Sequence, residues 1–330
     1  MLLWIGFITF ICILLALDLG VFNRQSHVIS AKEALGWTSL WVTISLLFSF
    51  FVYFGYRDHW FGLGMELGHP LPPETAVLKY LTGYLVEQSL SIDNIFVIAV
   101  IFSYFHIPKQ YQHRVLFWGI VGAIVFRGIM ILAGAFLIER FNFITYVFGA
   151  ILLYSAYKML DTDHDKVDPN KNPLVNFFKR YFPVVRTIHK EHFFIKRMGK
   201  TVATPLFIAL LVVETTDIMF AFDSIPAIFA ITADPFLVFS SNIFAILGLR
   251  SMYFVLVSVL NRFKYLQYSL VLILVFVGIK MLLIHFVHLP EWLSFVVILT
   301  MLGGGILFSL FKENDEAKTK KKKAESNLVD

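Results

Sequence analysis

Long apolar runs constrain this chain more than any other feature of its sequence. Nine mostly apolar segments follow one another, and most reach the roughly 20 residues that an α-helix needs to cross a bilayer. Hydrophobic residues make up 58% of the 330 residues and charged residues 15%, against roughly 45–50% and 25% in soluble domains. The sequence predicts an all-α polytopic membrane protein with nine transmembrane helices, at about 2–22, 37–56, 77–103, 114–138, 143–160, 203–230, 236–260, 266–287 and 291–311.

This composition excludes a soluble enzyme and a nucleic-acid-binding protein. Cys12 is the only cysteine, which also excludes a disulfide scaffold. No GxxxxGK[ST] loop and no DKTGT phosphorylation motif occurs, so direct use of ATP is not expected. We therefore expect neither an enzyme nor a resident cofactor.

The distribution of lysine and arginine predicts the orientation of the chain. Of the 28 such residues, 21 lie in or beside the connections of spans 1–2, 3–4, 5–6 and 7–8 or in the C-terminal tail, and 2 lie in the other connections. Positive charge collects on the cytoplasmic side, so we expect the N-terminus outside and the C-terminus in the cytoplasm. The basic stretch 176–200 predicts a helix lying on the anionic inner leaflet, and the Lys-rich tail predicts a disordered segment.

The spans and their connections predict seven segments. Two N-terminal helices and an external loop come first, two three-helix units flank a cytoplasmic loop, and a ninth helix precedes a polybasic cytoplasmic tail. The predicted bounds are 1–56 for the first two helices, 57–76 for the external loop, 77–160 for repeat A, 161–202 for the cytoplasmic loop, 203–288 for repeat B, 289–311 for the ninth helix and 312–330 for the tail.

The two three-helix units, spans 3–5 and 6–8, resemble each other. The segment EQSLSIDNI at 87–95 matches DIMFAFDSI at 217–225, so that two acids and a following amide or hydroxyl align. Each unit has an odd number of spans, so the second must enter the membrane from the opposite side. Inverted repeats of this kind are typical of secondary transporters, whose substrate site lies near the midplane where the repeats meet. Further matched pairs are Arg127 with Arg250, Arg140-Phe141 with Arg262-Phe263, and Lys158-Met159-Leu160 with Lys280-Met281-Leu282.

Five carboxylates lie inside spans three and six. An ionised acid at the bilayer centre costs roughly 2.5–3.5 kcal/mol on insertion scales, so five are not expected to be kept for packing. Arg127 and Arg250 lie at similar depth and are expected to balance two of these charges, which leaves three for a divalent cation and a proton. Asp18, near the inner end of span one, has either a capping or pairing role or a functional one. The five acids are Glu87, Asp93, Glu214, Asp217 and Asp223.

Clustered oxygen ligands select hard cations such as Mn²⁺, Ca²⁺ or Mg²⁺. Asp93 and Asp223, as the symmetric pair, are the expected central metal ligands. Glu87 and Asp217 come next, and Asn94, Ser224 and Asn242 could add neutral oxygens. Glu214 has no counterpart in repeat A and is a candidate proton carrier or ligand. In an ideal helix Glu214 and Asp223 face opposite sides about 13 Å apart along the axis, so they share an ion only if the helix is interrupted, as Pro226 could allow.

Several long motifs resemble those of the TerC family of bacterial integral membrane proteins, most of all its Alx-type branch. They are EQSLSIDNIF at 87–96, ETTDIMFAFDSIP at 214–226, NIFAILGLRSMY at 242–253 and GIKML at 278–282. The resemblance covers about residues 10–290 and implies export of metal ions, chiefly Mn²⁺, across the bacterial inner membrane by inverted three-helix repeats. It also implies that the functional acids are the five intramembrane carboxylates.

Three functions remain open at this point. The leading one is a secondary transporter that exports Mn²⁺, with protons as the exchanged ion. The second is a membrane scaffold or assembly factor for metallation or membrane-protein biogenesis, and the third is an exporter of Ca²⁺ or another cation. The expected partners are a divalent metal ion, protons and the anionic inner leaflet. Gly122, Gly128 and Gly134 indicate close packing of span four, either inside the bundle or between subunits.

Overall fold

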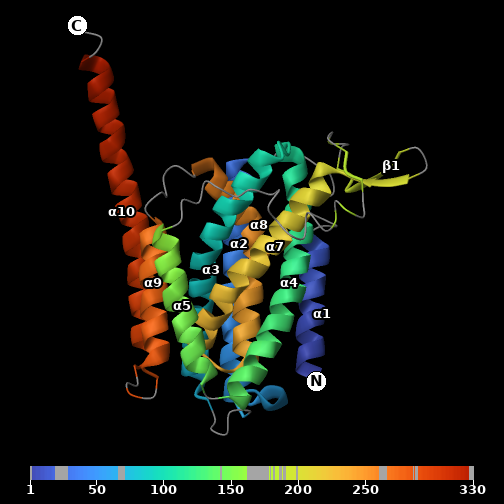
Figure 1. Cartoon of the computed structure of the whole chain (residues 1–330). Helices are drawn as coiled ribbons and strands as arrows, with labels where there is room; N and C mark the ends of the chain where they lie inside the picture. The colour runs from blue at the N-terminus through green and yellow to red at the C-terminus, as the bar shows by residue number, and fades with distance from the viewer. Residues whose placement is uncertain are drawn as a thin grey trace.

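The computed structural model describes residues 2–18, 29–65, 71–141, 143–161, 191–197, 200–259, 266–284 and 289–326, and a few single positions between them. This part of the chain folds almost entirely into helices that stand side by side (Figure 1). The helices are α1 (Leu2–Leu17), α2 (Ala31–Arg57), α3 (Pro73–Tyr104), α4 (Lys109–Arg140), α5 (Ile144–Asp161), α7 (Pro205–Phe229), α8 (Pro235–Val259), α9 (Leu266–Leu282) and α10 (Glu291–Ser326), with a short 3-10 turn at Trp60–Gly62.

Six of the described helices are long and apolar enough to cross a membrane: α2, α3, α4, α7, α8 and the first part of α10. The other three, α1, α5 and α9, are shorter apolar helices of the same bundle. This architecture confirms a polytopic all-α membrane protein. The count of nine membrane spans stays a prediction.

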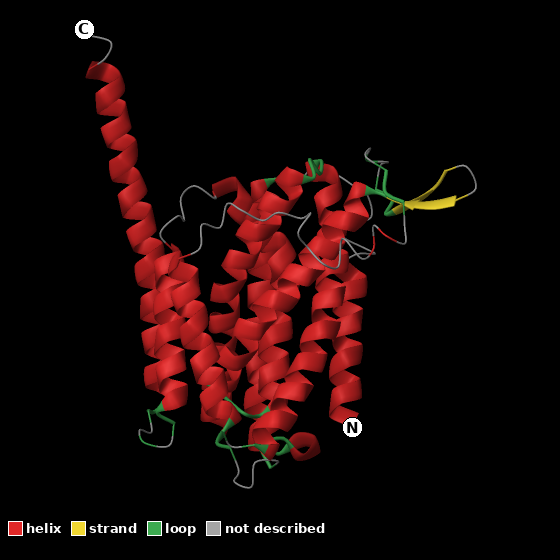
Figure 2. Cartoon of the chain, viewed as in Figure 1, coloured by secondary structure: helices red, strands yellow, loops and turns green. Residues whose placement is uncertain are grey.

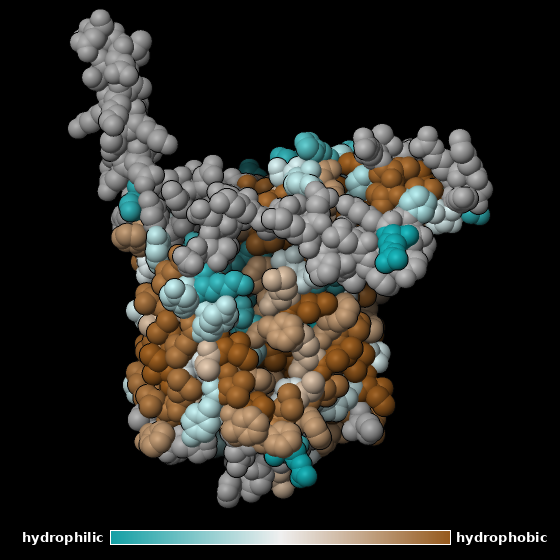
Figure 3. Space-filling view, viewed as in Figure 1, coloured by the Kyte–Doolittle hydropathy of each residue, from teal (hydrophilic) through white to brown (hydrophobic). Residues whose placement is uncertain are grey.

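The surface of the bundle matches an apolar environment. Large apolar side chains such as Val125, Ile129, Leu132 and Phe136 of α4 point outward and are more than half exposed. Hydrophobic residues form a band across the middle of the visible face, with hydrophilic residues toward both ends (Figure 3). Such a band suits contact with lipid hydrocarbon.

Two helices form the centre of the bundle. The apolar stretches of α3 and α8 are 72% and 78% buried, whereas those of α2 and α10 are 22% buried. The closest helix pairs are α5 with α9, α3 with α8 and α4 with α7. If the predicted repeats α3–α5 and α7–α9 are exchanged helix for helix, the α3–α8 pair becomes the α7–α4 pair and the α5–α9 pair is unchanged. The helix packing is therefore symmetric with respect to the predicted repeats.

Local sequence signals set several helix ends. The hydroxyl of Ser30 accepts a hydrogen bond from the backbone N–H of Glu33 and caps α2. Pro73 and Pro205 occupy first-turn positions, where a missing N–H costs nothing. Asp234 precedes α8, and its Oδ1 accepts from the backbone N–H of residues 236 and 237 at 2.9 and 3.2 Å. The hydroxyl of Tyr56 donates to Oδ2 of the same side chain at 2.7 Å, which ties α2 to the start of α8.

Two sequence predictions are wrong. The basic stretch 176–200 lies largely outside the described residues, but its end is not a helix. Phe194–Arg197 and Lys200–Ala203 form the antiparallel strands β1 and β2, which project from one end of the bundle (Figure 2). Alternating apolar and polar side chains in these four-residue segments suit a hairpin. The predicted disordered tail is also wrong, because α10 continues past 311 to Ser326 through a segment rich in Lys, Glu and Ala, all good helix formers, and free of Gly and Pro.

Candidate cation site

Arg127 of α4 is the centre of a buried polar cluster. Its side chain is 1% exposed and forms ion pairs with Glu87 of α3 and Asp217 of α7. Nη2 donates to Asp217 Oδ1 at 3.0 Å and Nε to Oδ2 at 3.3 Å, while Nη1 donates to Glu87. The planar guanidinium suits this bridging role, because its N–H groups point in fixed directions toward two carboxylates.

Neutral side chains complete the hydrogen bonding of this cluster. Asn242 of α8 is fully buried, and its Nδ2 donates to Glu87 Oε2 at 3.1 Å. Arg127 Nη1 also lies 3.2 Å from Ser224 Oγ and 3.4 Å from Asn242 Oδ1. The structure therefore joins residues from α3, α4, α7 and α8, which are distant in sequence, and it pairs Arg127 with two of the five intramembrane acids.

A small cavity lies beside this cluster, with room for about one water-sized sphere. Asp93 of α3 and Asp223 of α7, the predicted central ligands, both line it. Asp93 is 7% exposed, and its Oδ2 has no hydrogen-bond partner among the described residues. Asp223 accepts a hydrogen bond from the hydroxyl of Ser155 of α5. The other polar lining residues are Glu87, Asn94, Arg127 and Ser224.

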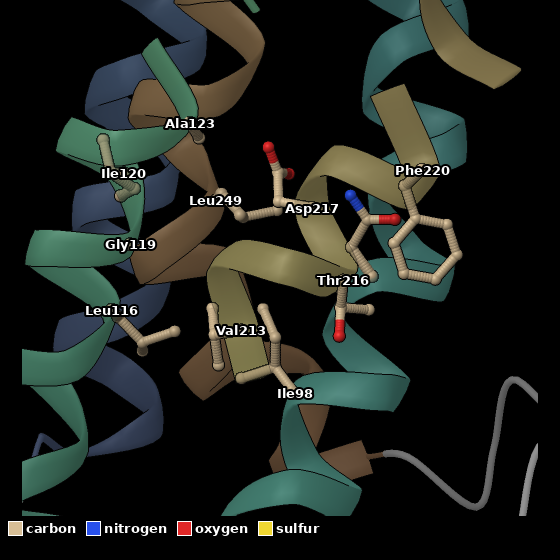
Figure 4. A pocket seen from close by; sticks show the side chains of 11 residues that line it. Ile98, Leu116, Gly119, Ile120, Ala123, Val213, Thr216, Asp217, Phe220 and Leu249 are labelled. Atoms are coloured by element: carbon tan, nitrogen blue, oxygen red, sulfur yellow. The ribbon is translucent and has the colours of Figure 1, made fainter. Parts of the chain in front are cut away.

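A second cavity lies on the other side of Asn94, between α3, α4, α7 and α8 (Figure 4). Asp217 and Thr216 are its polar lining residues besides Asn94, and the α4 wall includes Gly119 and Ala123. The hydroxyl of Thr216 donates to the carbonyl of Val212 in its own helix. Asn94 and Phe220 line both cavities, so they separate the carboxylate cavity from this more apolar one.

Glu214 lies apart from these acids. It is one helical turn before Asp217, and its carboxylate occupies the place where a Cβ on Gly122 of α4 would be. Its Oε2 is buried without a hydrogen-bond partner among the described residues. Gly122 is thus a notch in α4 that accommodates this acid. Gly128 and Gly134 face Phe239 and Phe229 in the same bundle, so the three glycines singled out in the fourth span pack inside the chain.

The second predicted arginine has a different partner from the one expected. Arg250 of α8 forms a buried ion pair with Asp18 at the end of α1 instead of balancing the five acids. The sequence predicts the depth of Arg250 in the membrane but not the direction in which its side chain points, which depends on how α8 packs. The second basic residue near the acids is Lys158 of α5, which lies close enough to Asp223 for their charges to interact.

No group of three or more His, Cys, Asp or Glu side chains in the described part of the chain lies close enough to hold a metal ion. Helix α7 is unbroken from Pro205 to Phe229, so Glu214 and Asp223 remain on different parts of one continuous helix. Pro226 lies in its last turn and cannot donate to the carbonyl of Phe222. The predicted ligands therefore lie in two groups and not in one cluster. Glu87 and Asp217 bind Arg127, whereas Asp93 and Asp223 line the cavity.

Sequence reasoning missed two residues that complete this picture. Ser155 is an ordinary serine in an apolar span, and nothing in the sequence indicates its bond to Asp223. The sequence indicated close packing at Gly122, but its contact with the Glu214 carboxylate depends on which sides of α4 and α7 pack together. Asp18 had a recognisable signal, an acid at a span end, and its pairing role is the one the structure supports.

A bundle of apolar helices that encloses carboxylates and an arginine is the architecture of a polytopic membrane protein with a polar core. Residues 73–317, from α3 into α10, match the model of the integral membrane protein TerC family. The chain belongs to the TerC family, as its motifs predicted.

Curated relatives match over most of their length. An "Uncharacterized membrane protein STKORF319" of Myxococcus xanthus is 49% identical over 310 residues, which cover 94% of this chain and 92% of that protein. The "Putative membrane-bound redox modulator Alx" of Escherichia coli K12 is 46% identical over 302 residues, or 91% and 92% of the two chains. An "Uncharacterized membrane protein" of Rickettsia bellii is 41% identical over 311 residues, or 94% and 98%. No solved structure matches this chain.

Proposed function

We propose that this chain is a secondary transporter that exports a divalent cation, Mn²⁺ above others, through the carboxylate cavity. The observation that carries the proposal is Asp93, which is buried, lines the cavity together with Asp223, and has an oxygen without a hydrogen-bond partner among the described residues. A buried carboxylate with an unsatisfied oxygen is costly. A bound cation offsets that cost.

The charges near the cavity favour a divalent ion. Glu87 and Asp217 share Arg127, and Lys158 lies near Asp223. With Asp93, four acids therefore face two basic groups. Counting Glu87, Asp93, Asp217 and Asp223 as ionised, the excess is two negative charges, which one divalent cation neutralises. Glu214 is then the fifth acid and carries a proton.

The oxygen-rich lining favours a hard cation. Carboxylate oxygens of Asp93 and Asp223, with the side-chain oxygens of Asn94 and Ser224, are the donors that Mn²⁺, Ca²⁺ and Mg²⁺ accept. Ion binding requires Asp93 and Asp223 to approach one another or Glu87 to exchange its arginine for the ion.

Alternating access follows from the repeats. We propose that α3–α5 and α7–α9 are inverted repeats, with the N-terminus outside and the C-terminus in the cytoplasm of a bacterial inner membrane. The pairing of α3 with α8, α4 with α7 and α5 with α9 supports this relation. A twofold axis in the membrane plane would exchange α3 with α7, α4 with α8 and α5 with α9, which turns the α3–α8 pair into the α4–α7 pair and leaves the α5–α9 pair in place. Rocking of one repeat against the other would open the cavity to either side.

Uptake of Mn²⁺ into inside-out vesicles with an imposed pH gradient tests this function. Wild type should accumulate Mn²⁺ and release protons, and Asp93→Asn and Asp223→Asn should abolish uptake. Glu139→Gln is the matched control, because Glu139 is an exposed acid at the end of α4. Equal uptake by wild type, both site variants and empty vesicles would refute Mn²⁺ transport. Competition by Ca²⁺ and Mg²⁺ separates the proposed substrate from the other hard cations.

A scaffold is the second candidate. The hairpin β1–β2 and the C-terminal part of α10 project from the same end of the molecule and offer surfaces away from the bundle (Figure 1). A scaffold predicts that function is lost when these parts are removed and survives Asp93→Asn, the reverse of the transporter. The redox role in the name of the Alx relatives is tested by Cys12→Ser, because Cys12 is the only cysteine.

A further inference from the structure

The basic side chains of the two repeats have different partners, although the helices that carry them are paired symmetrically. In repeat A, Arg127 contacts Glu87 and Asp217. In repeat B, its sequence counterpart Arg250 donates to Asp18 of α1, a helix outside both repeats. Exchange of the repeats would place Arg250 at the two acids that now hold Arg127. The structure therefore holds one of the two arrangements that the repeat relation allows.

The lysines in the third helix of each repeat differ in the same way as the two arginines. Lys158 of α5 lies about one helical turn after Ser155, which donates a hydrogen bond to the cavity acid Asp223. Its counterpart Lys280 of α9 places Nζ 3.3 Å from Oε2 of Glu291, the first residue of α10. Glu291 also lies 3.7 Å from Nζ of Lys79. Again the basic residue of repeat B is held by an acid from a helix outside the repeats.

A difference in one neutral residue explains why the two cavity acids are not equivalent. Ser155 lies three residues before Lys158 and donates to Asp223. The residue three before Lys280 is Val277, which has no side-chain donor. Asp93 therefore lacks the hydrogen bond that its counterpart has, and a positive charge from repeat B is the group that could neutralise it.

Asp18 and Arg250 form a buried ion pair, which by itself is weak evidence for stability. Both residues are 5% exposed, and Arg250 Nη1 has no hydrogen-bond partner among the described residues. Well-packed apolar residues often replace a buried ion pair without loss of stability. An ion pair that apolar packing could replace suits an interaction that is exchanged for another one during a cycle.

We propose that Asp18 and Glu291 are positioning residues that hold Arg250 and Lys280 away from the carboxylate cavity while Arg127 of repeat A lines it. In the opposite arrangement Arg250 replaces Arg127 at the acids, and Lys280 approaches Asp93. The two flanking acids thus set which side of the membrane the cavity faces. This inference rests on the proposed transport function and on its inverted repeats.

Thiol labelling from each side of the membrane tests the inference separately from transport. In a Cys12→Ser background, Leu274→Cys places a reporter in the cavity wall, and a membrane-impermeant thiol reagent is applied to right-side-out and inside-out vesicles. Asp18→Asn should shift the ratio of the two labelling rates about tenfold, within the roughly 5–150-fold of typical couplings. Glu291→Gln should shift it in the same direction but less, because the Glu291 side chain is 25% exposed.

A second substitution separates this role from a merely structural one. Arg250→Met added to Asp18→Asn should return the ratio to that of wild type, because no arginine is left to replace Arg127. Glu139→Gln should leave it unchanged. An unchanged ratio in Asp18→Asn or Glu291→Gln, or a shift that persists after Arg250→Met, would overturn the inference, while Mn²⁺ uptake by wild type would still stand. If Asp18→Asn fails to fold, Glu291→Gln alone decides.

Discussion

Replacing Arg127 by Met should destabilise the protein strongly. The arginine is 1% exposed and donates to Glu87, Asp217, Ser224 and Asn242. Its loss leaves two carboxylates without their cation inside the bundle. Breaking a buried ion pair by removing one partner costs about 3–5 kcal/mol, a large part of a total stability of about 5–15 kcal/mol.

Equilibrium unfolding in mixed micelles measures this change, with the fluorescence of the six tryptophans as the signal. Arg140→Met is the matched control, because Arg140 is an exposed arginine at the end of the same helix, and it should change stability by less than about 0.5 kcal/mol. The unfolding free energy of Arg127→Lys should lie between those of Arg127→Met and Arg140→Met. Lysine keeps the positive charge but lacks the planar guanidinium that reaches both acids.

The cause of the loss can be separated from lost packing. Adding Glu87→Gln and Asp217→Asn to Arg127→Met removes the two uncompensated charges and should recover most of the stability. If Arg127→Met costs less than about 1 kcal/mol, or if the neutral triple variant is no more stable than the single one, the cluster is not held together by charge compensation and this reasoning is wrong.

Three further substitutions test the packing around the site. Gly122→Ala places a Cβ on the Glu214 carboxylate, so proton-coupled Mn²⁺ uptake should fall by up to about 100-fold, the scale expected for a group misplaced by 1 Å. Gly304→Ala is the control, because a Cβ there meets open space. Equal uptake by the two variants would contradict the proposed role of Glu214 as proton carrier. Gly278→Leu should cost about 1–3 kcal/mol of unfolding free energy in mixed micelles, because a Cβ there lies 3.2 Å from a carbonyl oxygen of α5; no change would show that α5 and α9 can separate freely. Asp234→Ala should lower the free energy of unfolding by about 1–2 kcal/mol, because α8 loses its N-terminal cap. Asp234→Asn should lower it much less, because asparagine also caps helices. Equal losses in the two variants would show that the charge of Asp234 matters and not its capping.

The amino-acid sequence is sufficient to predict the membrane environment of this protein and the polar chemistry of its core. Apolar runs about as long as a bilayer is thick leave helices as the economical way to satisfy the backbone. Carboxylates inside those runs are too costly to be incidental. Spacing along the chain also matches Glu87 with Asp217 and Asp93 with Asp223 in the two predicted repeats.

Tertiary structure alone decided which of these polar groups meet. Arg127 and Arg250 occupy matched places in sequence, yet one reaches the carboxylates and the other reaches Asp18 of a helix that precedes the repeats. Ser155 became a partner of Asp223 only through the packing of α5 beside α7. Sequence fixes the spacing of side chains around one helix axis, whereas the rotation of that helix and the identity of its neighbours depend on packing across the whole bundle.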